Sequence, residues 1–156
     1  EGLSMSTQFV HELTVRVLAG KREGIFRSPS LYEPYRPVEE SDLAALEERL
    51  GHLLPQALRA FLMVAGYGDL NDVLSFREEW FAIIDGGELH GHVFFAQDIL
   101  GNFYSFDPGN GHVHFICRSS PEYAPMAAGF YQFLCELERY EFALEAWTDS
   151  LNCLPI

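Results

Sequence analysis

Residues 90–116 read HGHVFFAQDILGNFYSFDPGNGHVHFI, and this stretch decides the fold. Apolar runs rich in Val, Phe, Tyr and Ile are interrupted at residues 98–102 and again at 107–111. Runs of β-branched and aromatic residues that alternate with short segments of Asp, Asn, Gly and Pro are typical of strands joined by turns. The stretch therefore predicts three strands in an antiparallel meander. One face of that meander must be covered by apolar side chains from the rest of the chain.

Predicted helices supply much of the apolar surface that covers the meander. Apolar residues recur every three to four positions at 5–19, 39–50, 55–65 and 130–137, and a short last helix is expected at 142–147. Residues 39–42 place negative charge and capping oxygens at a helix N-terminus, Gly51 occupies a C-terminal cap position, and Pro55 suits a first helical turn. We expect the two helices at 39–65 to pack together and onto one face of the meander.

Proline and glycine mark the remaining segments. Pro29, Pro34 and Pro37 exclude a regular helix, so residues 24–38 are interpreted as an ordered surface linker. Residues 66–72 are interpreted as a polar loop, and 117–129 as an irregular connection containing Pro121 and Pro125. Short strands are expected at 73–76 and 80–84. The sequence thus predicts a single α+β domain, with a mainly antiparallel sheet of four to six strands packed against helices.

The length of 156 residues and a hydrophobic content of 48% fit one globular unit. We interpret residues 1–4 as a remnant ahead of a natural start at Met5, 5–37 as a helix with a proline-rich lead-in, and 38–156 as the main domain. No apolar run approaches the roughly 18 residues of a membrane span. Cys117, Cys135 and Cys153 form no metal-binding or disulfide pattern, so we expect reduced thiols and a cytoplasmic protein.

The charge is strongly negative and unevenly distributed. Ten basic residues stand against 23 acidic ones, a net charge of −13. Residues 60–156 contain 3 basic and 14 acidic groups, and no Lys or Arg occurs between Glu78 and Cys117. Such a field repels nucleic acid and anionic membranes and attracts a basic protein. Alternatively, the acidity only keeps the protein soluble.

The histidines suggest a metal site. His90 and His92, and likewise His112 and His114, stand two apart and would each place two imidazoles on one face of a strand, a geometry that suits zinc. No cysteine or carboxylate completes a known signature. We therefore expect no physiological metal and no cofactor.

Catalytic chemistry finds little support in the sequence. Cys117 and His114 could form a nucleophile pair, but no glycine-rich elbow or oxyanion loop accompanies Cys117. Asp98 and Asp107 could act as acid and base, yet both precede turn residues, where a carboxylate commonly accepts hydrogen bonds from the turn backbone. The glycine-rich turns lack the lysine and the helix that a phosphate-binding loop requires. The sequence predicts a protein that is not an enzyme.

Three motifs in order resemble a known family. They read Leu43-x-x-Leu-Glu-x-x-Leu50-Gly51, then Leu54-Pro55-x-x-Leu58-x-x-Phe61-Leu62, then Phe95-Ala-x-Asp98-x-x-Gly101-Asn102-x-Tyr104-x-x-Asp107. This order is similar to the SUKH superfamily, which includes bacterial immunity proteins and a fungal regulator of cell-wall synthesis. The resemblance extends from about Val38 to Leu137. One departure is Ala65-Gly66-Tyr67-Gly68, where the family usually has an Asn-Gly pair.

The resemblance implies an α/β fold without catalytic activity and a role in binding other proteins. We therefore expect an immunity protein that neutralises a cognate basic toxin domain, possibly a nuclease, as a monomer or weak homodimer. The alternatives are a regulatory scaffold without a toxin partner and a metal-dependent enzyme built on the four histidines. The residues expected to contact the partner are acidic groups and aromatic anchors of the second half of the chain: Tyr67, Asp69, Asp72, Glu78, Glu79, Trp80, Asp85, Glu88, Asp98, Tyr104 and Asp107.

Overall fold

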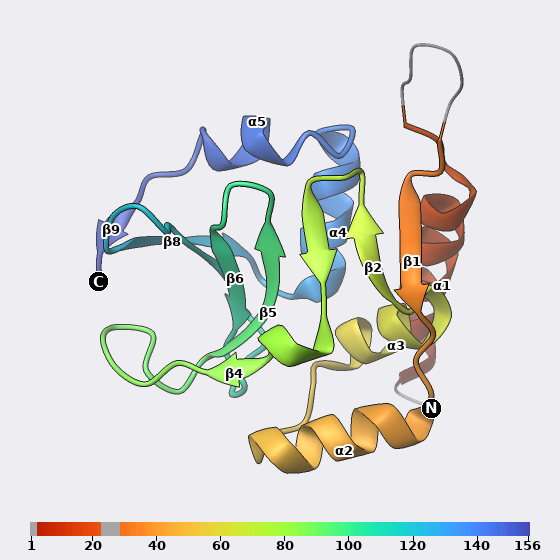
Figure 1. Ribbon diagram of the computed structural model, residues 1–156, viewed down its shortest axis with the longest axis horizontal. Helices are drawn as coiled ribbons and strands as arrows, with labels where there is room; N and C mark the ends of the chain where they lie inside the picture. The colour runs from red at the N-terminus through yellow and green to blue at the C-terminus, as the bar shows by residue number, and fades with distance from the viewer. Residues whose placement is uncertain (1–2, 23–28) are drawn as a thin grey trace.

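The predicted meander forms the middle of a larger antiparallel sheet. A computed structural model describes residues 3–22 and 29–156, with side chains from Thr7 onward (Figure 1). Strands β5 (Val93–Asp98), β6 (Phe103–Phe106) and β7 (Val113–Ile116) pair in sequence order. Val93 lies opposite Phe106, which in turn lies opposite Val113. A bulge between Phe94 and Ala96 lets both Phe95 and Ala96 be buried.

The sheet is larger than the predicted four to six strands. The described residues form nine, in the order β1-β2-β3-β5-β6-β7-β8-β9, and β4 pairs with β5 beside β3. The α+β class and the antiparallel pairing are confirmed. The strands outside the meander are β1 (Tyr32–Arg36), β2 (Tyr67–Leu70), β3 (Leu74–Phe76), β4 (Ala82–Ile83), β8 (Glu122–Ala127) and β9 (Leu154–Pro155).

Three of the predictions for loops and linkers were wrong. β1 lies in the predicted linker, whose residues 24–28 are outside the described part of the chain, and β8 lies in the predicted irregular connection. β1 is at the end of the strand order, where a proline such as Pro34 costs little. Gly68 made β2 resemble a loop, but a Cβ at this position would lie 2.5 Å from the carbonyl oxygen of Glu33. The glycine is needed because β1 passes close to it.

The helices match the predicted spacing. The structure has α1 (Leu3–Ala19), α2 (Glu40–Leu50), α3 (Gln56–Ala65), α4 (Phe130–Arg139) and α5 (Leu144–Thr148), and a short 3-10 helix η1 (Glu78–Trp80) precedes β4. α1 begins at Leu3, inside the tetrapeptide that we interpreted as a remnant, and residues 1–2 are outside the described part. Glu39 and Asp42 form a reciprocal capping box at the start of α2, and Gly51 ends it with φ of 72°.

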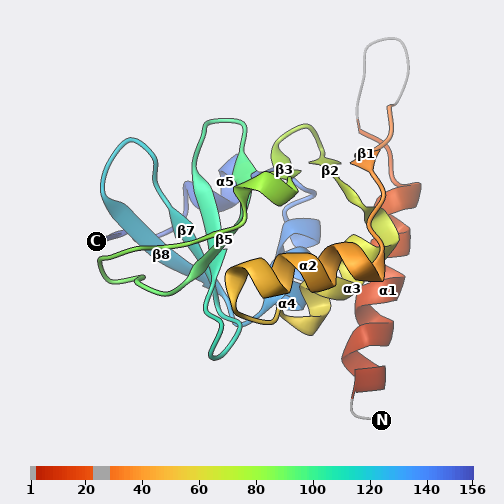
Figure 2. The same cartoon turned by 60° about the horizontal axis from the view of Figure 1, so that its bottom comes forward.

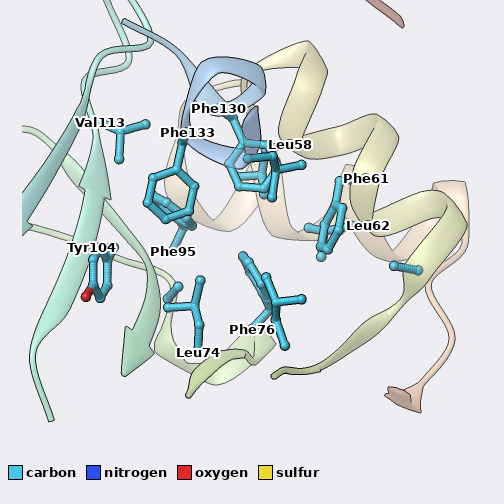
Figure 3. Close-up of a cluster of buried hydrophobic side chains, with 14 of the residues drawn as sticks. Leu58, Phe61, Leu62, Leu74, Phe76, Phe95, Tyr104, Val113, Phe130 and Phe133 are labelled. Carbon is cyan, nitrogen blue, oxygen red and sulfur yellow. The ribbon is translucent and has the colours of Figure 1, made fainter. Parts of the chain in front are cut away.

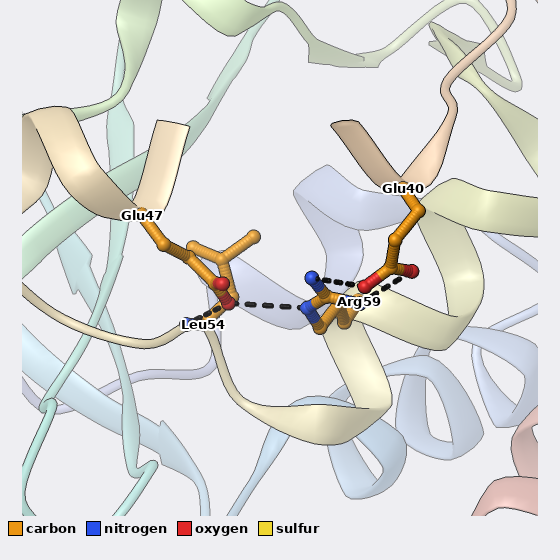
Figure 4. Close-up of polar contacts among 4 residues, drawn as sticks. All are labelled: Glu40, Glu47, Leu54 and Arg59. Atoms are coloured by element: carbon orange, nitrogen blue, oxygen red, sulfur yellow. Dashed lines mark hydrogen bonds and ion pairs between the residues drawn. The ribbon is translucent and has the colours of Figure 1, made fainter. Parts of the chain in front are cut away.

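One arginine joins α2 to α3 (Figure 4). Arg59 lies 2.7 Å from Glu40 and 3.2 Å from Glu47. The second carboxylate also accepts the backbone N–H of Leu54, in the connection between the helices. These hydrogen bonds raise the pKa of Arg59, and the same contact lowers the pKa of Glu40. The polar contacts fix the angle at which the two helices meet.

The core lies between the sheet and the helices (Figure 3). An aromatic cluster from both layers fills it: Phe61, Phe76, Phe95, Phe130 and Phe133 are at most 2% exposed, with ring centroids 5.2–6.2 Å apart where they meet. Edge-to-face and tilted pairs at such distances add to the free energy of burial.

α1 belongs to this same core. It lies against α3 and α4 (Figure 2), and its Val10, Leu13 and Val17 are at most 1% exposed. None of the helices in the described ranges is long and apolar enough to cross a bilayer.

Candidate partner-binding surface

The outer face of β2 and β3 carries an arginine held between aromatic rings. Leu74 and Phe76 point into the core, so Ser75 and its cross-strand partner Asp69 point outward. The Asp69 carboxylate accepts the Ser75 hydroxyl at 2.6 Å and the Arg77 guanidinium at 3.2 Å. Predicted contact residue Asp69 is therefore part of an ordered, charge-compensated cluster.

The same guanidinium contacts two rings. Arg77 lies 4.4 Å from the ring centroid of Tyr35 on β1 and 5.5 Å from that of Trp80 on η1. Cation–π contacts of this kind orient an arginine. Tyr35 is 45% exposed and Trp80 is partly exposed, so both rings remain accessible beside the guanidinium. Trp80 was predicted as an anchor, whereas Tyr35 and Arg77 were missed because Tyr35 lay in the predicted linker. The signal available was the alternation at residues 75–77, which places Arg77 on the outer face with Ser75.

Only one of the two glutamates of η1 has its charge compensated. Arg36 lies 2.9 Å from Glu78, and its guanidinium lies over the ring of Tyr67 at 5.0 Å. Arg49 of α2 donates to the backbone carbonyls of Glu78 and Phe81, which fixes η1 to that helix. Glu79 is exposed and lies in no ion pair with any residue that the structure describes.

Two of the predicted aromatic anchors are corrected. Tyr67 and Tyr104 are both 0% exposed: the Tyr67 ring is covered by Phe81 and Arg36, and the Tyr104 ring lies against Phe115 and Phe133. Burial raises the pKa of both hydroxyl groups, and the adjacent Asp98 carboxylate raises that of Tyr104 further. Neither ring can contact a partner in this conformation, so both belong to the fold.

Asp98 organises the turn between β5 and β6. Its carboxylate accepts the backbone N–H groups of Leu100 at 3.0 Å and Asn102 at 2.9 Å, the Asn102 amide at 3.2 Å and the Tyr104 hydroxyl at 2.8 Å. Asp98 therefore accepts hydrogen bonds from the turn backbone, which is the structural role that its place before turn residues suggested. With four donors, the carboxylate acts as a structural centre rather than as a free surface charge.

The other predicted carboxylates are spread around the sheet. Asp72 lies in the turn between β2 and β3, near the Asp98 turn, since the Ile99 N–H donates to the Val73 carbonyl at 2.9 Å. Asp85 and Glu88 are exposed on the connection between β4 and β5. Asp107 follows β6 at the end opposite to Asp98. The predicted residues thus form separate groups rather than one continuous patch.

The histidines do not form a group of metal ligands. His92 and His114 are neighbours, with ring centroids 5.1 Å apart, and His92 Nε2 lies 3.7 Å from Asp107 Oδ2. His90 and His112 are exposed. In residues 3–22 and 29–156, no three side chains of His, Cys, Asp or Glu lie close enough to hold a metal ion.

Burial lowers the pKa of His92 and of His114, and for His114 the neighbouring histidines add to the effect. Asp107 acts in the opposite direction on both. The Nδ1 atoms of the two rings are buried without a hydrogen-bond partner among the described residues. The pair therefore favours two neutral rings.

Comparison with known proteins identifies the family. The model of the SMI1 / KNR4 family (SUKH-1) matches residues 37–136, which is more than half of the chain. The chain belongs to the SUKH-1 family. No curated protein and no solved structure matches it. The SUKH-1 match covers α2 to most of α4, and α1, β1, α5 and β9 lie outside it, so we call these four elements the additions to the matched segment.

Proposed function

We propose that this SUKH-1 protein is an immunity protein that binds and neutralises a cognate basic toxin domain. Membership of a family known for immunity proteins supports the class of function. The observation that supports a basic partner is that most basic side chains of this chain are in ion pairs, whereas several exposed carboxylates are not. Six of the ten basic side chains are held in ion pairs within the chain, whereas exposed Glu79, Asp85 and Glu88 are in none among the described residues.

The electrostatic attraction would act mainly on the rate of association. Exposed carboxylates on η1 and on the connection between β4 and β5 attract a cationic domain over several ångströms, and salt screens that attraction. Trp80 and Tyr35, ordered by Arg77, supply aromatic surface for the contact itself. The protein acts without catalysis, metal or cofactor, in the cytoplasm, as a monomer or weak homodimer, with neither nucleic acid nor membrane as its partner.

The alternative is a regulatory scaffold that binds cellular proteins and neutralises no toxin. It shares the family and the fold, and it explains the acidity as a contribution to solubility. The two differ in whether one basic toxin domain is bound tightly and inactivated.

Stopped-flow association at 50 mM and 500 mM NaCl tests the proposal, with a basic toxin domain taken from the genes that flank this chain's gene as the probe. Flanking genes that encode no toxin domain favour the scaffold. The variant Glu79→Gln, Asp85→Asn, Glu88→Gln should associate about tenfold more slowly at low salt. The control variant Glu12→Gln, Glu48→Gln, Glu122→Gln removes the same charge from exposed positions elsewhere and should change the rate much less. Absence of binding and of toxin inhibition favours the scaffold. Binding at equal rates in all three proteins contradicts the electrostatic part alone.

A further inference from the structure

Two large apolar side chains stand exposed at the tip of the β5–β6 hairpin. Ile99 is 70% exposed and Leu100 is 58% exposed. In Figure 1 this tip lies at the upper edge of the sheet, beside α5. Single exposed aliphatic side chains are ordinary on a protein surface, whereas these two adjacent ones form a small apolar patch that a partner can cover, and they are more exposed than the adjacent pair Met63 and Val64, at 40% and 38%.

The turn that presents them is held on several sides. Asp98 accepts four hydrogen bonds from within the hairpin, and Gly101 adopts φ of 88°. The Asn102 side-chain oxygen accepts the backbone N–H of Arg118 at 2.8 Å, which ties the turn to the segment after β7. Apolar groups that are already fixed lose little conformational entropy when a partner covers them.

The tip forms a ridge between two hollows. Ile99 lines a hollow of about 980 Å³ with Val73 and Phe142, and Leu100 lines one of about 550 Å³ with Phe115 and Thr148. Ile99, Leu100 and the first residues of α5 line a smaller hollow under the tip. The surface is therefore a ridge with a recess on each side, which can interlock with a partner of complementary shape.

Unusual backbone geometry gathers at the larger hollow. Four non-glycine residues with positive φ, namely Asn71, Asp72, Glu141 and Phe142, all line it. The Asn71 amide donates to the Phe142 carbonyl at 2.8 Å, which joins the two strained segments. Left-handed conformations of such residues cost free energy and concentrate at functional surfaces.

Carboxylates outnumber cations around the ridge. Asp72, Glu141, Glu145 and Asp149 line the two hollows, and none of them is in an ion pair with another described residue. Lys21 and Arg118 are the cations there that lie in no ion pair within the described ranges. The ridge is thus apolar along its crest and acidic at its margins.

We propose that this ridge, defined as Ile99 and Leu100, is an apolar contact site for the toxin domain at the Asp98 end of β5, away from η1 and the β4–β5 connection at the other end of that strand. The inference rests on the proposed function and names a surface for it. The occupant is an apolar recess in the toxin domain bordered by Lys and Arg side chains, because its centre covers the aliphatic crest and its border faces the carboxylates. A second copy of this chain is a poorer occupant, since its own acidic margins would face the same carboxylates.

Calorimetric titration with the same toxin domain, in an inactivated form, tests the ridge. We expect Ile99→Ser, Leu100→Ser to weaken binding at least 100-fold. The control variant Leu53→Ser, Leu154→Ser also replaces two exposed aliphatic side chains by serine, but away from the ridge. These side chains are 77% and 49% exposed, and the control should change Kd less than threefold. The urea unfolding midpoint of the ridge variant should match that of the wild type, because the two side chains contribute little to the core.

Each other result has a separate meaning. Wild-type binding that persists in the ridge variant overturns the ridge and leaves the immunity function intact. Wild-type protein that does not bind overturns the proposed function. A wild-type dimer in sedimentation equilibrium that the ridge variant abolishes assigns the ridge to a second copy and overturns the toxin as its occupant. A large loss of unfolding midpoint shows that the tip belongs to the core.

Discussion

The carboxylate of Asp98 explains why its sequence motif forms the turn between β5 and β6. Its four hydrogen bonds involve Leu100, Asn102 and Tyr104, and one of the donors belongs to a fully buried ring. Removing an acceptor from a buried donor costs more than the same bond at the surface. The motif Asp-x-x-Gly-Asn-x-Tyr therefore describes one hydrogen-bonded unit rather than a set of independent contacts.

Replacing the charged acceptor should be measurable. We expect Asp98→Asn to lower the free energy of unfolding by about 2 kcal/mol and Tyr104→Phe to lower it by about 1 kcal/mol. In the double variant the two effects should overlap by about 1 kcal/mol, because they remove the same hydrogen bond. Urea titrations of the four proteins give the three differences. Fully additive losses would show that the hydroxyl and the carboxylate act independently.

Gly68 shows how one missing side chain allows two strands to pair. A Cβ on Gly68 would approach the backbone of β1 to 2.5 Å and 2.7 Å, whereas a Cβ on Gly86 would meet nothing within 4 Å. Gly68→Ala should lower the free energy of unfolding by about 3 kcal/mol, while Gly86→Ala should change it by less than about 1 kcal/mol. Urea unfolding measures both, and hydrogen exchange should show β1 as the first strand to lose protection. Equal stability of the two variants would contradict the close approach.

Among the elements, β7 carries His114, and its partner His92 directly precedes β5; both rings are half-buried. In the folded protein burial lowers the pKa of His92 and of His114, so the folded state binds fewer protons than the unfolded one. Stability is then fully present above the ordinary histidine pKa of about 6.5 and falls as the pH drops from there toward the lowered folded values. The groups that face the pair are Asp107, His112 and Tyr123.

The pair should make the fold sensitive to mild acid. We expect the urea midpoint of the wild type to drop between pH 7.5 and pH 5.5, and the drop to be smaller in His92→Phe, His114→Phe. Replacing exposed His11 by Phe controls for the loss of an imidazole. A pH dependence that is the same in wild type and double variant would show that other groups cause it.

At the scale of the whole molecule, the matched segment and its additions share one core. α1 lies outside the matched residues 37–136, yet it buries three aliphatic side chains against α3 and α4. Each such side chain contributes about 1.5–3 kcal/mol when fully buried, and a domain of this size is stable by about 5–15 kcal/mol in total. We therefore expect α1 to contribute a large part of the stability of the fold.

Deleting residues 1–19 should test this dependence. We expect a truncated chain that unfolds at clearly lower urea concentration and binds the dye ANS, because the apolar side of α3 is uncovered. Leu13→Ala should cost about 3 kcal/mol in the full chain and serves as the milder variant. A truncated chain with the unfolding midpoint of the intact protein would show that α1 is an attachment only.

The sequence predicted what depends on local periodicity. The five helices, the meander and its two turns follow from the spacing of apolar residues and from turn chemistry. Strands β3 and β4 also lie within predicted strand ranges, but β1, β2 and β8 did not follow, because Pro34, Gly68 and Pro125 oppose strand structure locally and only pairing with distant segments overrides that preference.

The sequence also predicts only some of the residues of the candidate surface, because the rest depend on contacts between distant segments. The composition showed where charge accumulates, but the face on which a ring lies is decided by what covers it. Tyr104 and Ser105 are neighbours in an aromatic run, and both are fully buried. The cation–π cluster around Arg77 joins residues 77–80 to Tyr35 on β1, and no spacing in the sequence predicts the contact between these two distant segments.

The two ends of the strand order have one further consequence. β1 has Pro34 at its centre, and two-residue β9 ends in Pro155, so each offers an incoming strand few consecutive N–H donors. Strand addition is a common route both to peptide recognition and to fibres. This chain is therefore poorly suited to polymerise through these edges even when it accumulates. We therefore expect a partner to recognise this chain through its side chains rather than by adding a strand to the sheet.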